Sequence, residues 1–127
     1  YPECWKSYVM LNDASGFQHV YLCTGYTDLR KGIDGLISIV TGTFGLDPTE
    51  AGSIFLFCGR RNDRMKVLLY EGDGWLLCYK RFTDGKLQWP RSEKEARDLT
   101  PQQYRWLMEG LSIEQKKVIH KVKPELY

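Results

Sequence analysis

The sequence predicts an α+β domain built on a small antiparallel sheet, a β-meander of about four or five strands, packed by one N-terminal helix and followed by C-terminal helices. Three patterns predict this class. A central segment alternates between two faces as a hairpin does, a helical stripe of apolar residues precedes it, and two helix-capping sequences follow it. The 127 residues, 43% of them hydrophobic, suffice for one compact core.

We expect a single domain over residues 1–127. Its parts are an N-terminal extension at residues 1–11, an α/β core at 18–91, a helical segment at 92–111 and a basic tail at 112–127. Every apolar run is shorter than the roughly 20 residues that a membrane-crossing helix needs, and no signal-peptide pattern opens the chain. We therefore expect a soluble, cytoplasmic protein with no membrane partner.

The first predicted elements are a strand at residues 19–23 and a helix at residues 28–44. The strand reads His-Val-Tyr-Leu-Cys and is closed by a Thr-Gly pair. The apolar residues that follow have helical spacing: Leu29, Ile33, Leu36, Ile37, Val40 and Phe44. Gly32 and Gly35 each cost a helix about 1 kcal/mol relative to alanine. We expect them to allow close packing on the hairpin, with approach of the backbone to a phosphate as the alternative.

The start of this helix carries an unusual charge pattern. Either Thr27 or Asp28 can cap the helix. Arg30 and Lys31 then occupy the first turn, where the helix dipole disfavours cations. These cations could pair with Asp28 and Asp34, although only Arg30 has an acid four residues later in the helix. Local ion pairs and contact with an anionic partner both remain open for these two cations.

A buried strand, a hairpin and a short last strand should complete the sheet. Residues 53–58 contain a nearly continuous apolar run, which predicts a central strand covered on both faces. The hairpin spans residues 64–81, and residues 86–89, ended by Pro90, predict the last strand. Taken in chain order, these strands predict an antiparallel meander.

Beyond Pro90 the signals change from strand to helix. Residues 92–95 and residues 100–103 each form a capping box, and the second has proline at the first helical position. The second helix should end at Gly110. The tail beyond it holds four lysines: Lys116, Lys117, Lys121 and Lys123. These lysines either contact nucleic acid or are simply solvated.

The hairpin is the most informative part of the chain, because its register follows from its turn. With Gly72 and Asp73 as the turn residues, four cross-strand pairs share one face: Tyr70 with Trp75, Leu68 with Leu77, Lys66 with Tyr79, and Arg64 with Arg81. The opposite face carries Met65, Val67, Leu69, Leu76 and Cys78, with Lys80 at its end. One face is therefore basic and aromatic, and the other is a plain core face.

A basic and aromatic face suits nucleic acid, because cations neutralise phosphates and rings stack on bases. Residues 58–91 hold eight Lys and Arg against four Asp and Glu. The candidate DNA contacts are Arg60, Arg61, Arg64, Lys66, Lys80 and Arg81, with Arg30 and Lys31 as a second patch. The candidate stacking or interface residues are Tyr70, Trp75 and Tyr79. For these aromatic residues we favour core packing under the helix over ligand contact.

The sequence shows no catalytic or cofactor-binding constellation. Its four cysteines, Cys4, Cys23, Cys58 and Cys78, form no Cys-x-x-Cys pair and lie far from His19 and His120. We therefore expect no metal site, no cofactor and reduced cysteines within the core. P-loop, nucleophile-elbow and zinc-protease motifs are absent from the sequence. We expect a protein that is not an enzyme.

Several motifs together resemble one known family. They are Val20-Tyr21-Leu22, Gly25, the run from Thr27 to Leu36, Asp47-Pro48, Ile54-Phe55-Leu56-Phe57, Arg60-Arg61, Asp63-Arg64-Met65-Lys66, Gly74-Trp75, Lys80-Arg81 and Trp89-Pro90. In this combination the chain resembles the TnpB-type accessory protein of bacterial insertion sequences of family sixty-six, from about residue 12 to about residue 113. That family is distinct from the RNA-guided nucleases that share the letters TnpB.

The resemblance implies a protein encoded beside a separate transposase and needed, or helpful, for movement of the element. It implies no particular biochemical activity, so the molecular role depends on the residues. They favour a non-catalytic DNA-binding module that contacts the element ends, with the transposase or another accessory subunit as a further partner. The alternative is a protein-interaction adaptor with Trp75, Trp89 and Trp106 as anchors. A metal-dependent nuclease using Asp28 or Asp63 is the weakest alternative.

Overall fold

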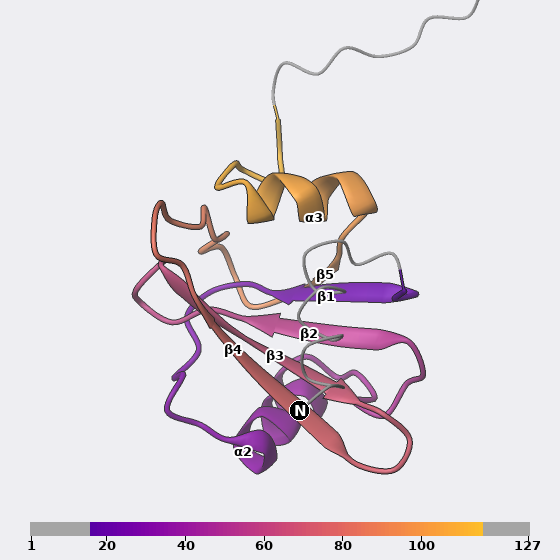
Figure 1. Ribbon diagram of the computed structural model, residues 1–127. Helices are drawn as coiled ribbons and strands as arrows, with labels where there is room; N and C mark the ends of the chain where they lie inside the picture. The colour runs from indigo at the N-terminus through magenta and orange to yellow at the C-terminus, as the bar shows by residue number, and fades with distance from the viewer. Residues whose placement is uncertain (1–15, 116–127) are drawn as a thin grey trace, which may run out of the picture.

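Residues 16–115 are described by the computed structural model, in which a sheet lies between two helical layers (Figure 1). In chain order the elements are β1 (His19–Cys23), α2 (Ile33–Ser38), the π-helical turn η1 (Ile39–Thr43), β2 (Ser53–Phe57), β3 (Arg64–Tyr70), β4 (Trp75–Arg81), β5 (Ala96–Asp98) and α3 (Pro101–Met108). The strand order within these residues is β4-β3-β2-β1-β5. The α+β class is confirmed.

The sheet is mixed, so the prediction of a wholly antiparallel meander is wrong. β1 and β2 run parallel, with His19 opposite Ser53 and Leu22 opposite Leu56. β3 and β4 continue antiparallel from β2, and β5 pairs antiparallel with β1. A parallel pair needs a crossover between its strands, and here α2 and η1 provide it.

The central helix begins at Ile33, later than the sequence predicts. Gly32 is its N-cap in an extended conformation, with φ −90° and ψ −163°. The predicted caps, Thr27 and Asp28, are therefore wrong. After one α-helical segment the backbone widens into the π-helical turn η1, which ends before Phe44.

The later start also changes the setting of the charged and glycine residues nearby. Arg30 and Lys31 precede the helix instead of occupying its first turn. A Cβ built on Gly35 would come within 3.1 Å of the Lys31 Cβ, and one built on Gly32 would meet nothing within 4 Å. The expected close packing on the hairpin is therefore wrong for Gly32, and the nearest neighbour of Gly35 is Lys31.

Residues 86–89 do not form the predicted last strand. Leu87 and Trp89 are instead buried in the core cluster that also contains Tyr104 of α3. The indole N–H of Trp89 donates to the carbonyl oxygen of Cys23 at 3.0 Å. Side-chain burial thus holds this segment against the end of β1, where a backbone ladder was expected.

Residues 92–95 form no helix, so the prediction from the first capping box is wrong. The end of β1 pairs with their backbone. The Thr24 N–H donates to the Glu95 carbonyl at 3.0 Å, and the Glu95 N–H donates to Thr24 Oγ1 at 2.9 Å. The Thr24 hydroxyl also donates to the Glu93 carbonyl at 2.7 Å. These bonds keep the segment extended and lead it into β5.

The second capping box is confirmed. Thr100 Oγ1 accepts from the Gln103 N–H at 3.1 Å, and Gln103 Oε1 accepts from the Thr100 N–H at 2.9 Å. Pro101 opens α3, as the sequence predicts. The helix buries Tyr104 and Leu107 against the sheet, so the cap fixes an element that belongs to the core.

One apolar cluster lies on each face of the sheet. The face under α2 and η1 gathers Cys23, Leu36, Val40, Phe55, Phe57 and Leu68. The face under α3 gathers, among others, Leu22, Ile54, Leu56, Met65, Val67 and Leu107. Strand β2 contributes to both clusters by alternation and is buried at every position, which confirms the predicted central strand.

The hairpin of β3 and β4 has the predicted register, confirmed pair by pair from Tyr70 opposite Trp75 to Arg64 opposite Arg81. Trp75 and Leu77 pack against the cluster under α2. The ring centres of Tyr70 and Trp75 are 4.8 Å apart. The basic and aromatic face is therefore divided, because its turn end joins the core while its open end carries the cations.

Cys23 and Cys58 are buried free thiols, and Cys78 is half-buried. Burial raises the pKa of the Cys23 thiol far above its usual value. Cys4, the expected extension at residues 1–11 and the lysines beyond residue 115 lie outside the described residues. In the described part of the chain, no helix combines the length and apolar character that a membrane crossing requires.

We predict that Thr100→Ala lowers the free energy of unfolding by about 1 kcal/mol, because it removes the cap of α3. Urea unfolding followed by circular dichroism measures this change. Thr100→Ser keeps an oxygen at the cap and should stay within about 0.5 kcal/mol of wild type. Equal losses in the two variants would show that the capping bond is not the cause.

Candidate nucleic-acid interface

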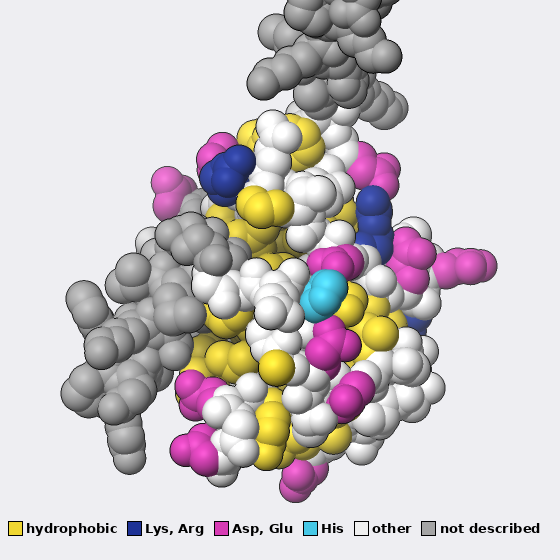
Figure 2. All heavy atoms as spheres, turned by 90° about the vertical axis from the view of Figure 1, so that its right-hand side faces the viewer, with side chains coloured by type: hydrophobic (Ala, Val, Ile, Leu, Met, Phe, Trp, Pro, Cys, Tyr) yellow, Lys and Arg dark blue, Asp and Glu magenta, His cyan; other side chains and the backbone are white. Residues whose placement is uncertain are grey.

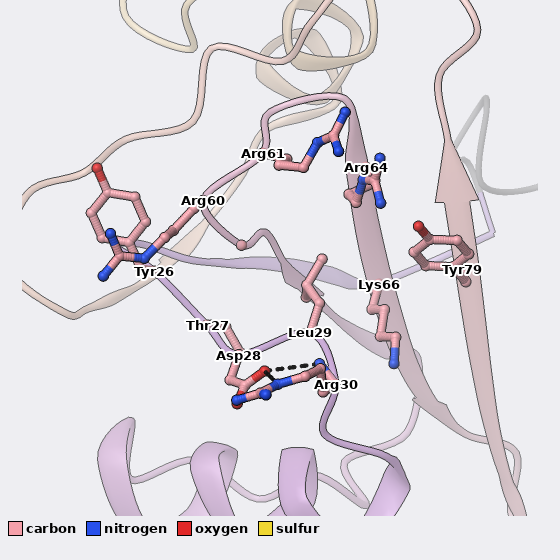
Figure 3. Close-up of a pocket in the computed structure, with 11 residues that line it drawn as sticks. Tyr26, Thr27, Asp28, Leu29, Arg30, Arg60, Arg61, Arg64, Lys66 and Tyr79 are labelled. Atoms are coloured by element: carbon pink, nitrogen blue, oxygen red, sulfur yellow. Dashed lines mark hydrogen bonds and ion pairs between the residues drawn. The ribbon is translucent and has the colours of Figure 1, made fainter.

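An open groove of about 830 Å³ lies at the edge of the sheet where β1 and β2 end (Figure 3). Five of the candidate DNA contacts line it: Arg30, Arg60, Arg61, Arg64 and Lys66. Tyr26 and Tyr79 line it as well, and Asp28 is the only acid among the described residues of its lining. The groove therefore combines positive charge with two aromatic rings.

The sheet topology explains why segments far apart in the sequence meet in this groove. β1 and β2 are parallel neighbours, so their carboxyl ends lie at the same edge. Residues 26–30 follow β1, and residues 59–61 follow β2. The Thr27 N–H donates to the Cys58 carbonyl at 3.0 Å and joins the two loops. Cations that the sequence places in two patches thus share one surface.

Two glycines permit the close approach of these loops. A Cβ built on Gly59 would come within 3.3 Å of both the Thr27 carbonyl oxygen and Leu29 Cγ, so a side chain there would push the loops apart. Gly25 has φ +82°, a left-handed conformation that glycine adopts without strain. Gly25 therefore lets the chain turn out of the sheet and toward the groove.

The remaining candidate cations lie outside the groove lining. Lys31 is joined to it by its carbonyl oxygen, which accepts from Lys66 Nζ at 3.1 Å. Lys80 occupies the opposite face of β4, with its Nζ 5.1 Å from the ring centre of Phe82. Arg81 is exposed at the end of β4. The alternation of a strand thus separates cations that are close together in the sequence.

The aromatic candidates are also divided between the groove and other parts of the structure. Tyr79 lines the groove, whereas Tyr70 and Trp75 lie at the turn end of the hairpin. Of the other predicted anchor residues, Trp89 is buried in the core and Trp106 is half-buried on α3. Among the proposed stacking residues, Tyr79 alone therefore faces the cations in the described structure.

Two carboxylates organise the arginines of the groove. Asp28 Oδ1 accepts from Arg30 Nε at 3.0 Å, and Asp28 Oδ2 accepts from Arg30 Nη2 at 2.9 Å. Asp63 accepts from Arg64 Nε at 2.9 Å and lies 3.6 Å from Arg61 Nη2. Counting Lys66 and Arg60 with these arginines, five cations oppose two carboxylates, an excess of three positive charges.

These ion pairs lower the pKa of both carboxyl groups. Hydrogen bonds from Arg30 lower the pKa of Asp28 to about 2, and a hydrogen bond from Arg64 lowers the pKa of Asp63. The side chains of Arg30 and Arg61 are nevertheless 91% and 71% exposed. Both can still donate hydrogen bonds to the oxygens of an anionic ligand.

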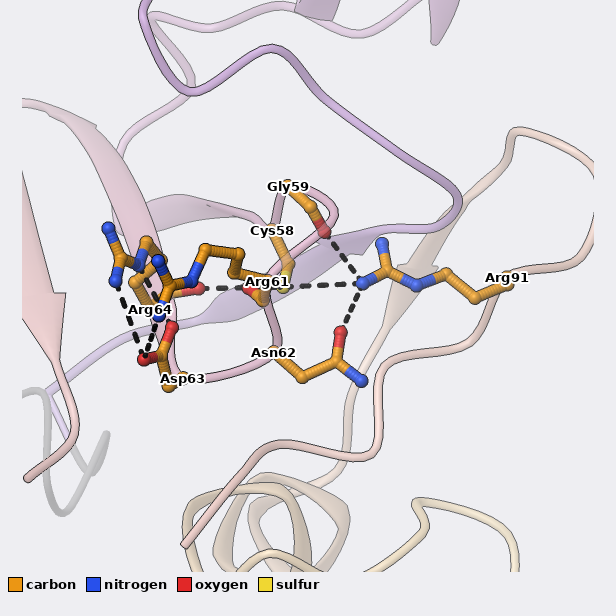
Figure 4. Close-up of polar contacts among 7 residues, drawn as sticks. All are labelled: Cys58, Gly59, Arg61, Asn62, Asp63, Arg64 and Arg91. Carbon is orange, nitrogen blue, oxygen red and sulfur yellow. Dashed lines mark hydrogen bonds and ion pairs between the residues drawn. The ribbon is translucent and has the colours of Figure 1, made fainter. Parts of the chain in front are cut away.

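Arg91 braces the loops behind the groove (Figure 4) and was missed in the sequence. It donates from Nη1 to the Gly25 carbonyl at 2.8 Å and from Nη2 to the Gly59 carbonyl at 2.6 Å. Nη2 also donates to Asn62 Oδ1. The guanidinium lies 4.1 Å from the ring centre of Tyr26. One half-buried cation therefore ties the loop after β1 to the loop after β2.

Neither Arg91 nor Tyr26 gives a strong signal in the sequence. Arg91 is a single cation after a proline, outside the hairpin that concentrates the other candidates. Tyr26 lies between a glycine and a threonine, with no periodic pattern around it. The proximity of these two residues depends on the pairing of β1 with β2 and on the path of residues 86–91, which local patterns do not specify.

Asp28 and Asp63, the acids considered for a metal, are each paired with an arginine. Within the described residues, no three His, Cys, Asp or Glu side chains gather as metal ligands would. What the groove presents is N–H donors, positive charge and exposed rings, a combination that suits a polyanion.

Comparison with known proteins identifies the family. Residues 18–118 match the family described as IS66 Orf2 like protein. The chain belongs to this family. The match confirms the resemblance drawn from the sequence motifs. The IS66 Orf2-like proteins are insertion-sequence accessory proteins.

Two relatives of this IS66 Orf2-like protein come from Sinorhizobium fredii (strain NBRC 101917 / NGR234). The uncharacterized protein y4hO is 35% identical over 92 residues, which cover 72% of this chain and 79% of the relative. The uncharacterized protein y4jC is 29% identical over 102 residues, which cover 80% and 86% of the two chains. No solved structure matches this IS66 Orf2-like protein. Its molecular role must therefore be argued from the groove.

We predict that Arg91→Ala lowers the free energy of unfolding by about 2 kcal/mol, because the carbonyls of Gly25 and Gly59 lose a charged donor. Arg91→Lys should restore little of this, since one ammonium group cannot reproduce the planar fork. Urea denaturation measures both changes.

The matched control for the brace is Arg81→Ala, which removes an exposed arginine of β4 and should change stability by less than about 0.5 kcal/mol. If Arg91→Ala were no more destabilising than Arg81→Ala, Arg91 would not brace the loops.

Proposed function

We propose that this insertion-sequence accessory protein is a non-catalytic DNA-binding module that holds the phosphate backbone of the element ends in the groove. The observation that carries the proposal is the convergence of five cations from two distant segments: Arg30, Arg60, Arg61, Arg64 and Lys66. Four of them are arginines, whose planar fork matches the oxygens of a phosphate. An excess of three positive charges remains after their internal ion pairs are counted.

The groove cations are arranged for contact with an external ligand. Arg60 is exposed and approaches the Tyr26 ring at 5.7 Å, and the ion pairs of the described residues do not include it. Arg61 lies 3.6 Å from Asp63 but keeps most of its surface in solvent. As they bind phosphates, such groups would displace the counterions condensed on DNA, which makes the affinity dependent on salt.

The charge distribution of the molecule also supports DNA binding at the groove. Figure 2 shows the side where β1 begins, on which Asp and Glu side chains predominate over Lys and Arg. There His19 lies 2.7 Å from Asp98 and 3.5 Å from Glu50. The acidic side and the basic groove lie at opposite ends of β1. A polyanion approaching the protein would be steered toward the groove and away from the acidic side.

We predict that the double variant Arg60→Ala/Arg61→Ala binds DNA less tightly and with a weaker salt dependence. Fluorescence anisotropy with labelled element-end and scrambled DNA, each as duplex and single strand, measures affinity from about 50 to about 200 mM salt. Loss of two phosphate contacts should reduce the slope of log affinity against log salt by about 1.4 to 1.8.

The matched control is Lys86→Ala/Arg105→Ala, which removes the same charge from exposed positions outside the groove lining. Its slope should equal that of wild type. If wild type bound no DNA at low salt, or if the two double variants behaved alike, the groove would not be the DNA site. Adding Mg²⁺ or Mn²⁺ to the element-end DNA tests whether the protein is non-catalytic. Metal-dependent cleavage of the DNA that is lost in Asp28→Asn would show that it is a nuclease.

A protein-interaction adaptor remains the second candidate, and the edge strand β4 favours it. No described strand pairs with the outer side of β4. The Glu71 N–H donates to the Gly74 carbonyl at 2.9 Å and the Phe82 N–H to the Asp63 carbonyl at 2.7 Å, which fixes the alternation of the hairpin. The backbone groups of residues 75, 77, 79 and 81 therefore point outward. An extended segment of the transposase could add to this edge as a further strand.

A pair of substitutions at one outward position tests the adaptor. Tyr79→Ala and Tyr79→Pro both remove the side chain, but only the second removes the outward N–H. If the transposase pairs with β4, calorimetry should show binding by the alanine variant and at least about tenfold weaker binding by the proline variant. Equal affinities would exclude strand addition at this edge.

A further inference from the structure

We propose that the groove binds single-stranded nucleic acid, with Tyr26 and Tyr79 stacking on bases while the cations between them hold phosphates. This inference rests on the proposed DNA-binding function and specifies the form of its ligand. The preference for a single strand is argued from the positions of the exposed rings, whereas the cations support binding of phosphates in general.

The exposure of aromatic rings is concentrated in this groove. Among the described residues the large hydrophobic side chains that are exposed are Tyr26 and Tyr79, each 52% exposed, and Leu111. Both tyrosines line the groove. Figure 3 shows them at opposite ends, with Arg60 and Arg61 between them. A ring left half in solvent contributes less to the core than a buried one, so its surface is available to a ligand.

Tyr26 is held in place from inside the protein. The guanidinium of Arg91 lies 4.1 Å from its ring centre, and that guanidinium is bonded to the carbonyls of Gly25 and Gly59. Cation–π contact with a half-buried arginine fixes the ring without covering all of it. Arg60, at 5.7 Å, lies beside the same ring. A base stacked here would meet an aromatic surface already positioned, which lowers the ordering cost of binding.

Tyr79 is positioned by the sheet. It lies on β4 directly opposite Lys66 of β3, so its backbone is fixed by the hairpin ladder. Arg64, two residues before Lys66, shares this face and also lines the groove. The ring thus adjoins two cations on a rigid strand pair. A nucleotide whose base stacks on Tyr79 would have its phosphate within the reach of these side chains.

The combination of rings and cations favours a single strand over a duplex. In a duplex the bases are already stacked on one another, so its outer surface offers mainly phosphates and the two tyrosines would contribute little. A single strand exposes both groups at once, and proteins that bind it combine a positively charged groove with aromatic rings. DNA and RNA share this chemistry, so either strand is a ligand of the stated class.

The test measures anisotropy of labelled oligo-dT and oligo-U, of the oligo-dT duplex with oligo-dA, and of a strand of equal length with abasic sites. Wild type should bind the single strands more tightly than the duplex. Tyr26→Ala and Tyr79→Ala should each weaken single-strand binding about 5- to 150-fold. Tyr26→Phe and Tyr79→Phe keep the ring and should bind as wild type does. Binding to the abasic strand should be equal in all five proteins.

Three outcomes would overturn the inference. If the duplex bound as tightly as the single strands, or if the alanine variants lost as much affinity for the abasic strand, the rings would not stack on bases; the DNA-binding proposal would stand. If no nucleic acid bound at low salt, both proposals would fail. Thermal melts show whether each variant still folds cooperatively, which separates loss of the ring from loss of the fold.

Discussion

The parallel pairing of β1 with β2 is the constraint on which the rest of the structure depends. It requires a crossover, which the helical segment at residues 33–43 supplies. It also sends the chain out of both strands at one edge of the sheet, so residues 26–30 and residues 59–61 meet there. An antiparallel pair would place these loops at opposite ends, and the cations would form two separate patches.

Bringing two loops together leaves backbone carbonyls that need donors, and Arg91 supplies them. Its guanidinium is used inside the protein, on the carbonyls of Gly25 and Gly59 and on the Tyr26 ring. Arg61, in contrast, keeps most of its surface in solvent. These two arginines therefore differ in what they can do: Arg91 is engaged in holding the loops, and Arg61 is available to a ligand.

Local patterns predicted the elements that local interactions determine. The hairpin register follows from a four-residue connection and the period of two, and the cap of α3 follows from Thr100 and Gln103. β5 could not be predicted, because a strand of three residues is too short to show an alternating pattern. The bonds of Thr24 with residues 93–95, which precede β5, hold it beside β1. The groove was predicted in part: the cations of the hairpin are local, but their meeting with Arg30 and Tyr26 depends on topology.

Burial decides which aromatic residues of the hairpin are structural. Trp75 gives its surface to the cluster under α2 and packs on Tyr70, so moving it to meet a ligand would expose apolar area that the fold buries. Tyr79 lies beyond the end of that cluster, on the same face, and is half exposed beside the cations. One strand therefore carries a core residue at one end and an exposed ring at the other. The division follows the packing of the central helical segment, because the cluster that contains Leu36 and Val40 includes Trp75 and Leu77 but not Tyr79.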